Sequence, residues 1–83
     1  METTETINIR GIVIPVAWNK EGDVISVAIV TYNEEKYLVE NNAKGQQLFS
    51  LLRKRVVIDG GLVTRDEIKA IEINSFQEDT SKV

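Results

Sequence analysis

The chain has 83 residues, enough for one small domain. Hydrophobic residues make up 42% of it and charged residues 28%, which is the composition of a globular protein rather than a disordered one. It contains no histidine and no cysteine, which excludes disulfides, thiolate nucleophiles, imidazole bases and the common zinc, haem and iron–sulfur sites. Ten Val and ten Ile against five Leu favour a sheet over a helix bundle.

The net charge of −3 comes from the two ends of the chain. Residues 7–76 carry nine basic and nine acidic side chains, so this body is neutral. We expect it to be a single domain, with residues 1–6 and 77–83 as polar tails. The acidic start is unlike a secretory signal, and no apolar run approaches the ~20 residues of a membrane span. These observations predict a cytoplasmic protein without a membrane partner.

The first strand is predicted over residues 7–18, a long β-branched run. Ile7 and Ile9 share one parity, whereas Ile12 and Ile14 share the other. Gly11 lies where this phase changes, and a glycine inside a strand often marks a bulge or a sharp bend. We therefore expect a bulge or a sharp bend at this position, and a bulge would flip which side of the strand faces the core.

Two further strands follow the first. Residues 19–23 include a glycine suited to positive φ and predict a hairpin turn. Strands are then predicted over residues 24–31 and 36–40, joined by a second turn. The bulky or uncharged alternate residues that we expect to point into the core are Ile25, Val27, Ile29, Tyr37 and Val39.

A helix is predicted next, because the apolar period changes. Leu48, Leu51 and Leu52 are spaced i, i+3, i+4, which indicates a short amphipathic helix over residues 44–54. Asn42 is the expected N-cap. The run Arg53-Lys54-Arg55 would close the last helical turn, where cations complement the helix dipole.

The last two strands are predicted over residues 56–63 and 68–76, with a turn between them. Gly60 and Gly61 interrupt the first of these strands. The order is therefore strand, strand, strand, helix, strand, strand, which describes an all-β protein with one short helix.

This order resembles the OB fold, the oligonucleotide/oligosaccharide-binding barrel, as small bacterial proteins show it. The resemblance covers residues 7–76 and rests on the element order, on Gly11, on the leucine-rich helix and on Gly60-Gly61. It implies a five-stranded barrel. An Sm- or SH3-like barrel is the main competitor, and it would not place a helix between the third and fourth strands. OB folds typically bind their ligands on the face of strands two and three and on the flanking loops.

The resemblance implies a non-catalytic binding module, and single-stranded nucleic acid is the first expected ligand. Such a ligand needs aromatic side chains for stacking and basic residues along the backbone. Trp18 would either stack a base or cap the barrel as core, and Tyr32 would either stack or pack in its turn. The residues predicted for weak nucleic-acid binding are Trp18, Lys20, Tyr32, Lys36, Arg53, Lys54, Arg55 and Arg65.

Two alternatives remain open. Ala28, Val30 and Leu38 are predicted to form an exposed apolar strip, which would suit a protein partner or a second copy of the chain. The ring of Trp18 would alternatively hold a small molecule or a sugar. Catalysis has little support, because the adjacent carboxylates of Asp66 and Glu67 lie in a turn exposed to solvent. We therefore expect no enzyme, no cofactor and no metal.

Overall fold

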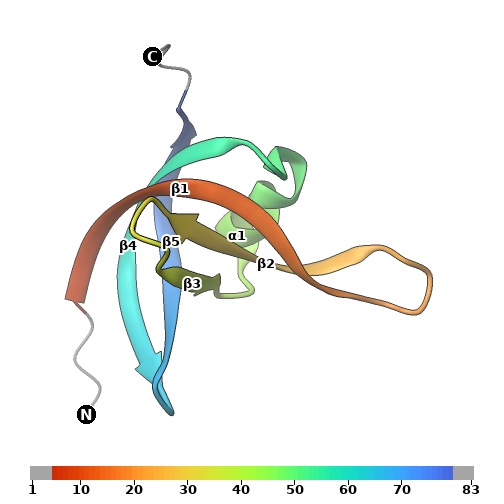
Figure 1. Cartoon of the computed structure of the whole chain (residues 1–83), viewed down its shortest axis with the longest axis horizontal. Helices are drawn as coiled ribbons and strands as arrows, with labels where there is room; N and C mark the ends of the chain where they lie inside the picture. Colours follow the sequence, from red (N-terminus) through yellow and green to blue (C-terminus); the bar gives the residue numbers. More distant parts are fainter. Residues whose placement is uncertain (1–4, 80–83) are drawn as a thin grey trace.

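The computed structural model describes residues 5–79, which form a closed five-stranded barrel (Figure 1). The strands are β1 (Glu5–Trp18), β2 (Val24–Thr31), β3 (Lys36–Val39), β4 (Arg55–Arg65) and β5 (Ile68–Glu78). One helical segment, α1 (Ala43–Gln47) continued by the 3-10 turn η1 (Leu48–Leu51), lies between β3 and β4. Around the barrel the strands follow the order β1-β2-β3-β5-β4, and β4 pairs back onto β1. The predicted fold class and element order are confirmed, and the architecture is compatible with an OB-like fold.

The core of the barrel consists of β-branched and leucine side chains from every strand but β3, together with Leu48 from η1. The largest fully buried residues are Val13, Val27, Ile29, Leu48, Val56, Ile58 and Ile71. Tyr37 on β3 is also buried, and Val39 packs against the same cluster. Burying one of the fully buried aliphatic side chains stabilises the folded state by about 1.5–3 kcal/mol. The inward orientation predicted for Val27, Ile29, Tyr37 and Val39 is confirmed.

Gly11 allows β1 to approach β2 closely. A Cβ atom at this position would lie 2.3 Å from the carbonyl oxygen of Val30, so a larger residue does not fit. The pairing of β1 with β4 nevertheless continues through Gly11 without a shift in register, and the pairing with β2 begins at this residue. Of the two features expected at Gly11, the bulge is therefore wrong. The register shifts of β1 lie further on, between Pro15 and Ala17 and between Ala17 and Trp18.

The unbroken register decides which side of β1 faces the core. Val13 is buried in the core cluster, whereas Ile12 is 37% exposed and Ile14 lies outside that cluster. Ile12 and Ile14 therefore lie on the outer surface of the barrel, opposite to the side that a bulge at Gly11 would give them. The prediction that Ile25 points into the core is also wrong. The register shift between Ala17 and Trp18 leaves Ile25 without a partner on β1, and its side chain is exposed.

The helical segment begins as predicted and ends earlier than predicted. The Asn42 side chain caps it by accepting a hydrogen bond of 2.8 Å from the backbone N–H of Gly45. The segment ends at Leu51, after which the N–H of Lys54 donates to the Leu51 carbonyl at 3.0 Å and Arg53 has a φ of 66°. The basic run thus forms a tight turn and the start of β4. Its assignment to the last helical turn is wrong.

The two C-terminal strands form a long hairpin. β4 is continuous through Gly60, where a Cβ atom would lie 2.3 Å from the carbonyl oxygen of Glu72. The predicted interruption is only a register shift between Asp59 and Gly60. Asp66 and Glu67 both have positive φ, the backbone of a two-residue hairpin turn. Within residues 5–79, neither helical segment has the length and apolarity that crossing a membrane requires.

Candidate binding face and groove

One row of side chains crosses four strands on the outside of the barrel. Residues paired directly across two strands point to the same side of a sheet. Ile12 pairs with Arg55 on β4 and with Val30 on β2, and Val30 pairs in turn with Lys36 on β3. The row Arg55–Ile12–Val30–Lys36, here called the basic row, therefore carries an exposed cation at each end and two apolar residues in the middle. None of its members is acidic.

A further cation and an aromatic ring flank the basic row. Arg10 precedes Ile12 by two positions on β1, so it shares the outer surface, and it is exposed. The last pair of β1 with β2 is Gly11 with Thr31, so Arg10 on β1 and Tyr32, the first residue of the turn after β2, are the next residues beyond this pair. Tyr32 is 65% exposed. The structure thus brings Tyr32 and Lys36 together with Arg10, a residue that the sequence interpretation missed.

The second row of the outer surface is apolar. Ile14 pairs with Ala28, Ala28 with Leu38, and Leu38 with Ala70. Ala28 has no exposed surface at all, because its single methyl group lies between the larger side chains of its two partners. The prediction that Ala28 belongs to an exposed strip is wrong. Val30 and Leu38 remain half-buried.

A groove of about 450 Å³ lies between the beginnings of β3 and β5. It exists because these two strands are paired only at Leu38–Ala70 and Val39–Ile71, so that they are not joined before these residues. Ile68 on its β5 side is 53% exposed. The residues lining the groove are Glu35, Lys36, Leu38, Glu67, Ile68 and Lys69.

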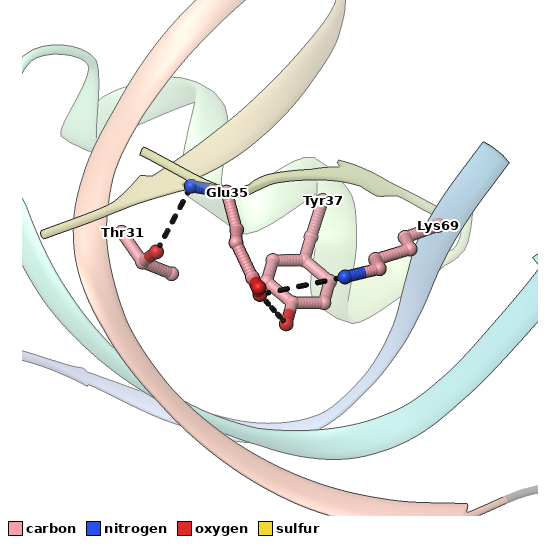
Figure 2. A network of polar contacts seen from close by, with 4 residues as sticks. All are labelled: Thr31, Glu35, Tyr37 and Lys69. Atoms are coloured by element: carbon pink, nitrogen blue, oxygen red, sulfur yellow. Dashed lines mark hydrogen bonds and ion pairs between the residues drawn. The ribbon is translucent and has the colours of Figure 1, made fainter. Parts of the chain in front are cut away.

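A polar network joins the β3 side of this groove to its β5 side (Figure 2). The hydroxyl of Tyr37 donates to Oε2 of Glu35 at 2.7 Å, and Nζ of Lys69 lies 3.5 Å from the same oxygen. The ammonium of Lys69 is also 5.7 Å from the centre of the Tyr37 ring. The backbone N–H of Glu35 donates to Oγ1 of Thr31 at 3.3 Å, which closes the turn between β2 and β3.

This network shifts two titrations in opposite directions. The hydrogen bond from Tyr37, followed by the charge of Lys69, lowers the pKa of Glu35. The same hydrogen bond, together with burial of the phenol, raises the pKa of Tyr37. Both shifts favour a charged Glu35 and a neutral Tyr37 at pH 7. The phenol can therefore donate its hydrogen bond to the ionised carboxylate at this pH.

Trp18 and Lys20 lie apart from the basic row. They belong to the end of the β1–β2 hairpin, which reaches out from the barrel (Figure 1). Trp18 is 55% exposed, so the expectation that it caps the core is wrong. The eight residues of β2 separate this end from Tyr32, a distance of roughly 25 Å at the usual strand rise. A single short ligand does not contact both ends.

The three residues of the basic run differ in position. The N–H of Arg53 donates to the Val13 carbonyl at 2.7 Å, and the Val13 N–H donates to the Lys54 carbonyl at 3.1 Å, so the run is held along β1. Lys54 forms an ion pair of 3.8 Å with Glu78. Only Arg55 belongs to the basic row. The side chain of Arg65, also predicted as a site residue, lies outside the described part of the structure.

Comparison of the chain with protein-family models, with curated proteins and with solved structures finds no match. Over residues 5–79, the structure brings together no group of three carboxylates that could hold a metal ion.

Proposed function

We propose that this protein is a non-catalytic, OB-like binding module that binds single-stranded nucleic acid weakly through the outer surface of β4, β1, β2 and β3. One observation carries the proposal: the register places Arg10, Lys36 and Arg55 around an apolar centre beside the exposed ring of Tyr32. Cations that follow a phosphate backbone, next to an aromatic platform, are what single strands require.

The same features indicate that the affinity is low. Stacking on one aromatic ring contributes about 1–3 kcal/mol per base, and the surface described here offers a single such ring. Phosphate contacts supply the remainder, and their contribution depends on salt. With three cations engaged, log Kobs should fall with log[salt] at a slope of about −2, from about 0.7 per phosphate on a single strand.

The test is an oligonucleotide titration at several salt concentrations. Fluorescence anisotropy and amide NMR are used to monitor binding. We expect shifts at Arg10, Tyr32 and Lys36, and a slope near the value above. Arg10→Gln should weaken binding and lower the slope by about 0.7. Lys20→Gln, at the far end of the hairpin, is the matched control and should leave both unchanged. If neither variant differs from the wild type, the surface is assigned wrongly.

A second candidate is a protein-interaction module or homodimer. It is favoured by the outward position of Ile12 and Ile14, which join Val30 and Leu38 in one apolar area rimmed by charge. Binding of a small molecule or a sugar by the exposed ring of Trp18 stays a prediction. The nucleic-acid proposal is preferred because the apolar area lies between cations.

A further inference from the structure

The groove between β3 and β5 is bordered by two strand edges. Within the described residues, Lys36 and Tyr37 are paired on one side only, with β2, and Ile68 and Lys69 are paired on one side only, with β4. Backbone donors and acceptors that point away from those partners therefore face the groove. An unpaired strand edge of this kind is a template for another strand.

The side chains around the groove add a selective pattern to these edges. Leu38 and the exposed Ile68 form an apolar centre. Glu35 and Lys69 neutralise each other by their ion pair. Lys36 and Glu67 then supply one positive and one negative charge on opposite sides, because they come from β3 and from the β4–β5 turn. The groove as a whole has no net charge.

We propose that this groove binds an extended peptide segment of a partner protein, which adds as a strand to the β5 edge. Main-chain hydrogen bonds would supply the affinity, and an apolar side chain placed between Leu38 and Ile68 would supply the specificity. The charge pattern selects an acidic residue of the peptide beside Lys36 and a basic residue beside Glu67. This proposal goes beyond nucleic-acid binding and uses a different surface, although Lys36 borders both.

Two observations favour a peptide over other occupants. A neutral lining gives no advantage to a polyanion, in contrast to the basic row. A groove of about 450 Å³ between two strand edges has the volume of a site for one short extended segment.

The experiment uses the full chain, labelled with 15N, and the peptide acetyl-Thr-Glu-Val-Leu-Val-Lys-Thr-amide. We expect saturable amide shifts at Leu38, Ile68 and Lys69, and slower hydrogen exchange at Lys69, because alternate residues of a strand direct their N–H groups to opposite sides and Ile68 closes the turn with β4. The same peptide with N-methyl groups on alternate residues keeps its side chains but loses backbone donors, and should bind at least tenfold more weakly. Equal binding of both peptides would overturn strand addition.

Variants of the exposed Ile68 separate this proposal from the previous one. Ile68→Asp should abolish peptide binding, and Ile68→Val should retain it within a factor of three. Oligonucleotide binding should not respond to Ile68→Asp, just as peptide binding should not respond to Arg10→Gln. Absence of shifts at millimolar peptide overturns the proposal, as do shifts in this region that follow protein concentration alone and indicate a second copy.

Discussion

Glu35 shows how one side chain can hold together parts of the chain that are distant in sequence. Its carboxylate accepts the Tyr37 hydroxyl from β3 and pairs with Lys69 from β5 (Figure 2). These contacts cross the open part of the barrel wall, where β3 and β5 are not yet paired. The lowered pKa of Glu35 and the raised pKa of Tyr37 are the titration signatures of this link.

Removing the hydroxyl should release the carboxyl group. In Tyr37→Phe we expect the pKa of Glu35 to rise toward 4.5, its ordinary value, because the largest cause of its depression is lost while Lys69 remains. Carboxyl NMR titration measures this directly. Lys69→Gln is the companion variant and should produce a smaller rise. An unchanged Glu35 titration in Tyr37→Phe would show that the hydrogen bond does not persist in solution.

The same shifts predict how stability depends on pH. A carboxyl with a depressed folded pKa stabilises the fold above its unfolded value of 4.5, and this contribution is lost as pH falls through the lower folded value. A phenol with a raised pKa stabilises below 10.0 and loses its contribution as pH rises through the folded value. In Tyr37→Phe the loss of stability in acid should be shallower and the alkaline loss weaker.

The strands depend on two close approaches that only glycine permits. Gly11 lets β1 run against β2, and Gly60 lets β4 run against β5, each with a partner carbonyl where a Cβ would stand. A closed barrel of five strands is strongly curved, and curvature of this kind requires positions without side chains. The register that places Ile12 outside depends on the first of these approaches.

Two glycine substitutions distinguish packing from backbone strain. Gly11→Ala should lower the free energy of unfolding by about 3 kcal/mol, because the new methyl group meets the Val30 carbonyl and forces the backbone apart. Gly22→Ala has open space around it and a φ of 88°, so its cost should be about 1–2 kcal/mol, from the backbone alone. Urea denaturation measures both. Equal losses would contradict a steric role for Gly11.

The whole molecule presents an outer surface that is apolar in the middle and basic at its ends. For a chain with a net charge of −3, this local concentration of cations is not evident from composition. It results from the barrel, which sets Arg55 on β4, Arg10 on β1 and Lys36 on β3, with β2 between the last two. The apolar centre between them is what a homodimer would use if the second candidate function holds.

Self-association should therefore respond to the centre of this surface rather than to its rim. If the chain dimerises, Ile12→Asp should shift sedimentation velocity toward the monomer, because Ile12 is the exposed apolar residue between Arg55 and Val30. Ile25→Asp changes an equally apolar, exposed residue outside the area and is the control. A wild type that remains monomeric at millimolar concentration would dismiss the homodimer.

Local patterns in the sequence determined the elements of this protein. Period-two alternation predicted the strands, the leucine spacing predicted the helical segment, and Asn42 was identified as its cap because capping depends only on neighbours three residues away. The order of elements then sufficed for a barrel with one helix, because few closed topologies accept a helix between the third and fourth strands.

The tertiary structure alone decided which side chains reach the surface. A change of apolar parity at Gly11 suggests a bulge, yet pairing with β4 carries the register through it, which turns Ile12 and Arg10 outward. Burial of Ala28 likewise depends on its cross-strand neighbours. The groove arises from how far β3 and β5 remain unpaired. The register at Gly11, the burial of Ala28 and the groove all depend on contacts between residues that are distant in sequence. The local periodicity of the sequence carries no information about such contacts.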